Sequence, residues 1–325
     1  MRTARKPIQC TTSLARSIAS ALARTLAHAA VIALAATSFH VAAHDTWFQP
    51  LPAPKLNQML LALGTGNQFP VQESAVGIEH LARSGCREIN GRVSALKFAR
   101  DTTTALVLST ATHQPLTCWA QLVPHEVELA PDKIALYLKE IQAPADVREQ
   151  WRQMQTRSLP WRERYTKHAR IHWPGADAAS APQQPPSPPE MALDIRLERT
   201  ATGRPVQAGE ALVFQVQRDG QPLPGLALEL RGDRSRFGIW RRTDADGRVQ
   251  LNAPPAGRWV LRGTDLRLSA SNPDEWESGF VTLAFEVVAR ADQNPSSSSS
   301  NARSANQTAA NAAMSSEPPI ITSWR

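Results

Sequence analysis

The clearest candidate for chemistry in this sequence is His44, which follows the small residues Val41-Ala42-Ala43. Small residues of this kind are typical of the site where a secretory signal peptide is cut. Cleavage after Ala43 places an α-amine and an imidazole on one residue, a bidentate nitrogen pair suited to a divalent transition metal such as Ni²⁺, Co²⁺ or Cu²⁺. Spacing does not fix the other ligands. The alternative is that His44 only begins the first strand, with Trp47 and Phe48 packed inward.

A second candidate ligand is His168, which has another histidine, His172, four residues later. Residues four apart lie about 5–6 Å from each other on a helix but about 13 Å apart in a strand. Residues 165–173 have a strand-like pattern, so we predict that the two histidines do not share one metal ion. His168 alone remains able to join His44 across the fold. The other histidines after residue 44 fall in an apparent loop or have no ligand partner nearby: His80, His113 and His125.

The chain begins with a basic and then apolar segment of the signal-peptide type. Five basic residues and no acidic residue precede His44, and an apolar stretch covers residues 26–39. A membrane span needs about 20 apolar residues, so we predict that residues 1–43 are a cleaved leader, that the protein is exported to the periplasm, and that no stable span remains. An uncleaved anchor is the alternative. Loss of the leader lowers the net charge from +7 to +2, which gives no electrostatic reason to expect a nucleic-acid partner.

Two cysteines follow the leader, Cys86 and Cys118. Both fall in the same predicted domain, and thiols are oxidised in the compartment that the leader predicts. We therefore predict one disulfide between them. Two buried free thiols are the alternative, because the sequence does not show whether the two Cα atoms come within reach.

The elements that must position these residues are mostly strands. Residues 44–122 alternate short apolar runs with turn residues, the pattern of an all-β domain. Helical spacing then appears over residues 131–141 and 144–156, each opened by a proline near its start. We predict an N-terminal β-sandwich over residues 44–173 with a helical segment at about 131–156.

A proline-rich stretch over residues 174–190 predicts a linker. Residues 191–290 contain seven short apolar runs separated by turn signals, which predicts a second sandwich of the immunoglobulin-like or transthyretin-like type. The tail, residues 291–325, is rich in Ser, Asn and Ala and is predicted to be disordered. The fold class is therefore all-β, with two β-sandwich domains and a short helical insertion at the end of the first.

Several motifs resemble a family of periplasmic proteins of unknown function that is loosely described as the periplasmic component of ABC-type nickel or cobalt uptake. They are residues 43–50 (AHDTWFQP), 61–70 (LALGTGNQFP), 162–170 (RERYTKHAR), 243–249 (TDADGRV) and 274–278 (DEWES). The resemblance covers nearly the whole chain after the leader, except the linker and tail. It implies export, β-sandwich architecture and metal handling. One departure is Arg170, at a position where the family pattern leads us to expect lysine.

The sequence contains no Gly-x-Ser-x-Gly elbow, no His-Glu-x-x-His helix and no phosphate-binding loop. We therefore predict that the protein is not an enzyme and that its only bound group is a divalent transition metal. Our first hypothesis is a periplasmic binding or accessory protein for nickel- or cobalt-type uptake. The alternative is a non-catalytic interaction module of the cell envelope that engages a membrane transporter or receptor through its sheet edges or loops.

Overall fold

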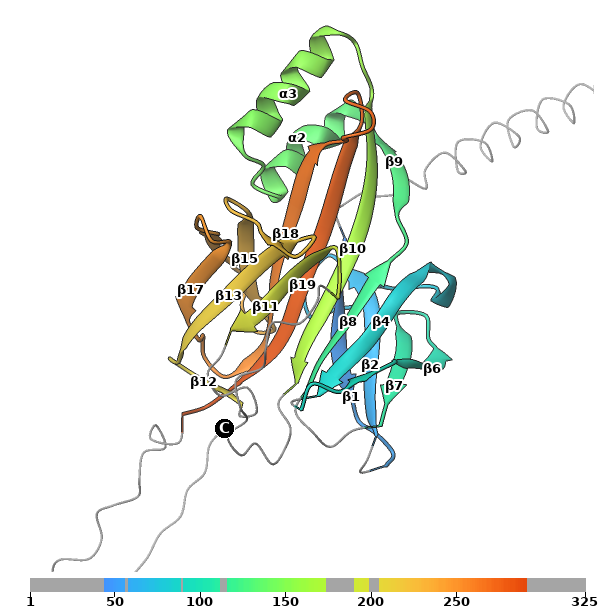
Figure 1. The fold of residues 1–325 in the computed structure, drawn as a ribbon, viewed down its shortest axis with the longest axis vertical. Helices are drawn as coiled ribbons and strands as arrows, with labels where there is room; N and C mark the ends of the chain where they lie inside the picture. Colours follow the sequence, from blue (N-terminus) through green and yellow to red (C-terminus); the bar gives the residue numbers. More distant parts are fainter. Residues whose placement is uncertain are drawn as a thin grey trace, which may run out of the picture. The chain divides into compact units, whose positions relative to one another are not determined.

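The computed structural model describes residues 44–55, 58–88, 90–111, 116–173, 190–198 and 205–290 (Figure 1). The predicted leader (1–43), nearly all of the predicted linker (174–189) and the predicted tail (291–325) lie outside the described residues. The cleavage site after Ala43 and His113 lie outside them as well.

The described residues form three sheets, which we name by position. The N-terminal sheet contains β1 (Asp45–Leu51), β2 (Met59–Gly66), β3 (Ser74–Ala75), β6 (Lys97–Asp101) and β7 (Leu106–Thr110). The C-terminal sheet contains β11 (Leu193–Glu198), β13 (Ala211–Arg218), β14 (Gln221–Pro222) and β17 (Arg248–Asn252).

The shared sheet takes strands from both halves of the chain. From the first half come β4 (Leu81–Glu88), β5 (Val93–Ser94), β8 (Leu116–Leu122), β9 (His125–Leu129) and β10 (Trp161–Trp173). From the second half come β12 (Val206–Gln207), β15 (Ala227–Gly232), β16 (Ile239–Arg242), β18 (Gly257–Leu268) and β19 (Trp276–Val288). The short helix η1 (Ile78–His80) precedes β4.

The two halves join through one parallel pair of strands, β10 and β19. Their register runs from Glu163 opposite Trp276 to Ile171 opposite Ala284. The prediction of two β-sandwiches is confirmed, but they are not separate bodies joined only by a linker, because both use the shared sheet. Parallel pairing of this kind needs a long connection, and the chain between the two strands contains the whole C-terminal sheet.

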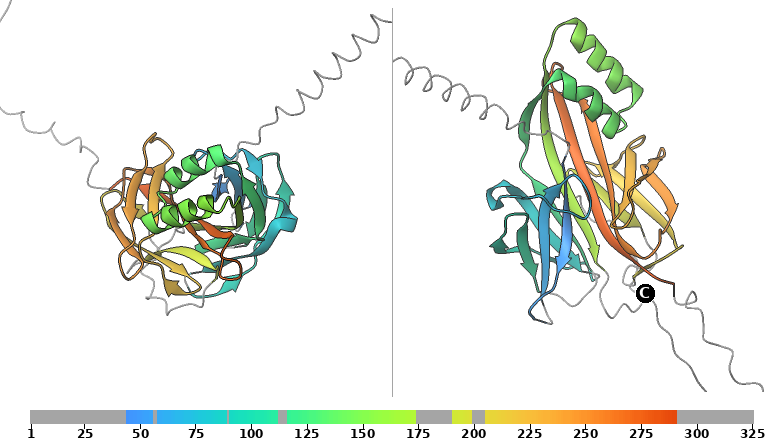
Figure 2. Two further views of the ribbon diagram at one scale, coloured as in Figure 1. Left: turned by 90° about the horizontal axis from the view of Figure 1, so that it is seen from above. Right: turned by 180° about the vertical axis from the view of Figure 1, so that it is seen from behind.

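Opposite faces of the shared sheet make the two sandwich cores, because successive side chains of a strand point to opposite faces. On β19, Leu283 packs with Phe214 in the core of the second sandwich. The next residue, Ala284, packs with Phe48 and Ile171 in the core of the first. The N-terminal and C-terminal sheets consequently cover opposite sides of the shared sheet, as the rear view in Figure 2 shows.

The two predicted helices are present as α2 (Pro131–Glu140) and α3 (Ala145–Thr156). They cover the end of the shared sheet where β10, β18 and β19 extend beyond the sandwiches (Figure 1). The indole rings of Trp161 and Trp276 stack there with centroids 4.6 Å apart. β10 begins four residues earlier than the predicted strand, because Trp161 and Glu163 continue its inward-facing alternation.

A buried carboxylate, Glu163, fastens α2 to these strands. It accepts hydrogen bonds from the Tyr137 hydroxyl and from the Trp161 Nε1–H, both at 2.8 Å, and a third from the Ser278 hydroxyl. Burial raises the pKa of Glu163, and the three donors oppose that rise. All of the donors come from packed elements, so we assign this cluster a structural role.

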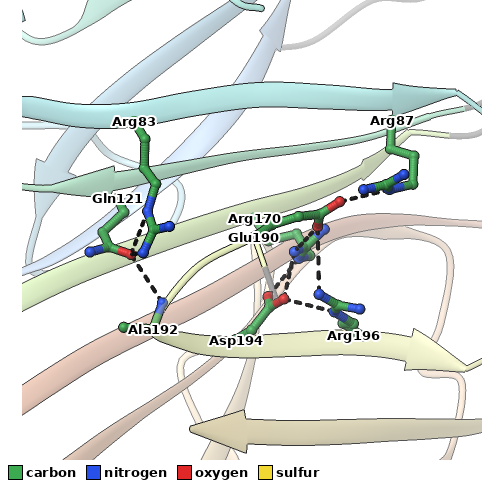
Figure 3. A network of polar contacts seen from close by, with 8 residues as sticks. All are labelled: Arg83, Arg87, Gln121, Arg170, Glu190, Ala192, Asp194 and Arg196. Carbon is green, nitrogen blue, oxygen red and sulfur yellow. Dashed lines mark hydrogen bonds and ion pairs between the residues drawn. The ribbon is translucent and has the colours of Figure 1, made fainter. Parts of the chain in front are cut away.

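A second buried network fastens the C-terminal sheet to the shared sheet (Figure 3). Arg170 on β10 donates to both carboxylate oxygens of Asp194 on β11, at 2.7 and 2.6 Å, and to Glu190 at 2.6 Å. Arg87 on β4 donates to the other Glu190 oxygen at 2.7 Å, and Arg196 donates to Asp194 at 2.8 Å. Three arginines therefore hold two carboxylates at the junction of the two sandwiches.

Candidate functional site

His44 lies directly before β1, and its imidazole is near a carboxylate. The Nε2 atom is 4.0 Å from a Glu73 carboxylate oxygen, and the His44 side chain is 31% exposed. The same Glu73 oxygen accepts a hydrogen bond from the Asn67 side-chain amide at 3.0 Å. The Glu73 main-chain N–H donates to the Thr65 carbonyl at 2.8 Å, which fixes the glutamate beside β2. His44 therefore has a positioned carboxylate on the Nε2 side of its ring.

Burial of the His44 side chain favours the neutral imidazole. Burial lowers the pKa of His44, and the Lys167 ammonium lowers it further, against the opposing effects of Glu73 and Asp45. Lys167 lies on β10, and burial lowers its own pKa to about 8. A neutral imidazole is the form that binds a metal ion, because protonation removes the nitrogen lone pair.

The residue after His44 belongs to a buried ion network. Arg262 on β18 bonds the Asp45 carboxylate, and it also donates to Glu229 on β15 at 2.8 Å. The second Glu229 oxygen is 2.9 Å from Nε of Arg231. Asp45 is 5% exposed and Glu229 is 2% exposed. These ion pairs thereby fix the position of β1 relative to β15 and β18.

A cleft of about 880 Å³ opens beside this network. It lies between α2 and the strands β15, β16 and β18, and its lining includes Asn67 and Asp45, the residue that follows His44. The hydrogen bond from Asn67 to Glu73 connects the cleft wall to the carboxylate beside His44. His44 and the cleft are therefore neighbouring parts of one region.

The structure does not bring His168 and His44 together. His168 is 3% exposed, and its Nδ1 lies 3.1 Å from the Phe280 carbonyl oxygen. The preceding residue, Lys167, is on the His44 side of β10, so alternation along the strand directs His168 to the opposite face. His172 lies on the same strand, and four residues of strand place it about 13 Å away.

The ring of His125 stacks on Tyr165 and meets the ring of His80 edge to face. The ring centroids of His80 and His125 are 4.8 Å apart, and those of His125 and Tyr165 are 5.7 Å apart. The prediction of a loop around His125 is wrong, because residues 125–129 form β9 and pair with β10. The alternation of Val127 and Leu129 with charged residues was the available signal for this strand.

Among the described residues, no group of three or more His, Cys, Asp and Glu side chains is arranged to hold a metal ion. A metal site at His44 consequently needs the main-chain amine as one of its donors. Within the same residues, no helix is long and apolar enough to cross a membrane.

The burial of His168 predicts an acid-sensitive folded state. Burial lowers its pKa from 6.5 to about 4, so between these values the unfolded chain binds a proton that the folded chain excludes, and stability falls as the pH falls. We expect wild-type protein to lose about 2–3 kcal/mol more than His168→Asn between pH 7 and pH 4.5, by urea unfolding. Equal losses would contradict this prediction, and the control is His80→Asn, at a histidine whose side chain is 44% exposed.

Comparison with known proteins places the chain in a family. No curated protein matches the sequence. Among solved structures, the crystal structure of native alpha-2-macroglobulin from Escherichia coli spanning domains MG0-NIE-MG1 matches with 8% sequence identity and a TM-score of 0.18, over 66% of this chain and 91% of that chain. The family described as Domain of unknown function (DUF4198) matches residues 41–264, which is more than half of the sequence. The chain therefore belongs to the DUF4198 family of unknown function.

Proposed function

We propose that this protein is an exported, non-catalytic metal-handling protein of the periplasm, a binding or accessory component of nickel- or cobalt-type uptake that acts with a membrane transporter or receptor. Its metal ligands centre on His44, which becomes the amino-terminal residue when residues 1–43 are removed. The motifs shared with the periplasmic uptake family support this proposal, and the surroundings of His44 supply its chemistry.

The observation that carries the proposal is the position of Glu73 beside Nε2 of His44. The α-amine and Nδ1 of an amino-terminal histidine close a six-membered chelate ring around a metal ion. A carboxylate that accepts a hydrogen bond from the other ring nitrogen orients such a ring and raises the basicity of the ligating nitrogen. At 4.0 Å, Glu73 lies just outside hydrogen-bond distance of that nitrogen. Late first-row metals favour nitrogen donors of this kind. The partial exposure of His44 leaves room for the metal to enter and leave.

The test uses the full chain after the leader, purified with His44 as its first residue and checked by mass spectrometry. Calorimetric titration with Ni²⁺, Co²⁺ and Cu²⁺ is expected to give saturable binding of one ion. Two variants remove one donor each: His44→Ala removes the imidazole, and a Gly-Ser extension before His44 keeps the imidazole but moves the amine. We expect each to weaken binding on the order of 100-fold or more.

His80→Ala is the matched control, because His80 is also near a carboxylate, Glu79 at 3.8 Å, but lies within the chain. It is expected to titrate like wild-type protein. Binding that survives both the Gly-Ser extension and His44→Ala would refute the assignment of the site, and an exported form that starts at a residue other than His44 would remove its basis.

One observation favours the alternative of an interaction module. β16 is the terminal strand of the shared sheet and pairs only with β15 among the described strands. Phe237, just before it, is 83% exposed, and Ile239 within it is 42% exposed. An edge strand with exposed apolar side chains can accept a strand from a partner protein. Under this alternative, His44→Ala and wild-type protein titrate alike with all three metals.

A further inference from the structure

The cleft beside His44 is much larger than a metal ion requires. Its volume of about 880 Å³ lies within the range of about 300–1,000 Å³ that holds small organic ligands. Its walls come from α2 on one side and from β15, β16 and β18 on the other, and its lining includes Asp45 and Asn67. Asp45 directly follows His44 in the chain. Asn67 bonds the Glu73 oxygen that lies 4.0 Å from the imidazole of His44. A ligand that fills this cleft therefore lies beside the proposed metal ligands.

The cleft lining carries a net positive charge. Five cationic side chains line it against three carboxylates: Lys139, Arg148, Arg231, Arg242 and Arg262 against Asp45, Glu140 and Glu229. The cations and carboxylates of the Asp45 network offset each other, because two arginines face two acids there. Three cations and one acid remain along the α2 side and the β16 side.

The two arginines among these three cations are held in place by main-chain carbonyls. Arg242 donates to the carbonyls of Gly225 and Gln142, at 2.9 and 3.0 Å, and Arg148 donates to those of Ala143 and Leu138, at 3.0 and 2.8 Å. Carbonyl partners fix the guanidinium groups without cancelling their charge. A fixed cationic wall with donors left over is suited to carboxylate groups.

We propose that the cleft binds an organic polycarboxylate chelator, so that the protein takes up nickel or cobalt as an anionic metal–carboxylate chelate rather than as a bare ion. This inference rests on the proposed function. The chelator's free carboxylates contact Lys139 and Arg242, while the metal presents its remaining coordination positions to the amine and imidazole of His44. The ring of Trp240 forms part of the same wall.

The experiment is equilibrium dialysis of the full chain that starts at His44, with Ni²⁺ and radiolabelled citrate supplied separately and together. Nickel is measured by atomic absorption and citrate by scintillation counting. We expect nickel and citrate to be retained together in equal amounts, and citrate to be retained poorly when nickel is left out or when His44 is replaced by alanine.

Charge variants are expected to change the affinity for nickel–citrate and the affinity for Ni²⁺ alone in opposite directions. In Lys139→Gln/Arg242→Gln, affinity for nickel–citrate is expected to fall about 5- to 10-fold. Affinity for Ni²⁺ without citrate is expected to stay the same or rise, because two positive charges near the cation are gone. Lys139→Gln alone changes only an exposed side chain and should show part of both effects. Lys133→Gln, elsewhere on α2 and outside the cleft lining, is the matched control.

The outcomes separate the two proposals. When nickel and citrate are supplied together, retention of nickel with no citrate overturns the chelate inference and leaves the metal site at His44 intact. A charge variant that lowers the affinities for nickel–citrate and for Ni²⁺ alone equally does the same. Citrate retained equally with and without nickel overturns it as well, since the cleft would then bind the anion alone. Retention of neither nickel nor citrate refutes the proposed function itself.

Discussion

Replacement of Arg170 by methionine is expected to lower the free energy of unfolding by about 3–4 kcal/mol. The side chain is 4% exposed and bonds Asp194 and Glu190, which are 2% and 7% exposed. Methionine has a similar length but no charge, so it leaves the two buried negative charges without the guanidinium that neutralises them. The remaining partners, Arg87 and Arg196, limit the loss, because each still bonds one of the two acids. Urea unfolding at pH 7 measures the effect.

Two further variants distinguish lost charge pairing from lost packing. Arg162→Met, on the same strand, removes an exposed pair with Glu128 at 3.4 Å and is expected to cost about 0.5 kcal/mol or less. Arg170→Met/Asp194→Leu removes a buried charge of each sign and should recover part of the stability. A loss below about 1 kcal/mol for Arg170→Met would show that the network does not hold the sandwiches together.

This network also shows what arginine provides at position 170, where we expected lysine from the sequence. A lysine there supplies a point charge, whereas arginine bonds both oxygens of Asp194 and still reaches Glu190. The guanidinium carbon also lies 5.7 Å from the centre of the Trp119 ring. Arginine therefore bonds two carboxylates and contacts one aromatic ring from a single position on β10.

The local elements of this fold could be predicted from the sequence, because each carries its own periodicity. The helices α2 and α3 follow a 3.6-residue spacing after a proline, and β13, β15, β18 and β19 are apolar runs between turn residues. The parallel pairing of β10 with β19 could not be predicted. Its partners are more than 100 residues apart, as Glu163 and Trp276 illustrate, and no local pattern encodes which strands meet.

The candidate site was predictable only at its first residue. The small residues before His44 indicate an amino terminus, and the residue type indicates a metal ligand. Glu73 approaches His44 because the same end of β2 pairs with β1 on one side and with β3 on the other, which spacing does not reveal. His168 has a suitable side chain, but its place in the alternation of β10 directs it away from His44. A one-residue shift along a strand changes the face, so residue type alone cannot decide such a question.

Loss of the bond between Cys86 and Cys118 is expected to cost about 3–4 kcal/mol. The two residues are paired across β4 and β8, their sulfur atoms are joined, and both are fully buried. The bond closes a loop with a sequence separation of 32 residues. Without it the unfolded chain gains conformational entropy, and for a loop of that length the gain lowers the free energy of unfolding by about this amount. Urea unfolding of Cys86→Ala/Cys118→Ala measures the loss.

Reduction supplies the control for that variant. Wild-type protein with a reducing agent should unfold near the urea concentration of Cys86→Ala/Cys118→Ala, and the agent should not affect the variant. A wild-type midpoint unchanged by complete reduction would contradict the prediction.

The same bond bears on the proposed export. Protein recovered from the periplasm should contain no free thiol at Cys86 or Cys118, since oxidation requires that compartment. Protein made in the cytosol without residues 1–43 should contain two free thiols and be less stable by the same amount. Because β4 and β8 of the shared sheet carry the bond, export through the proposed leader would also determine how stably the N-terminal sandwich is held.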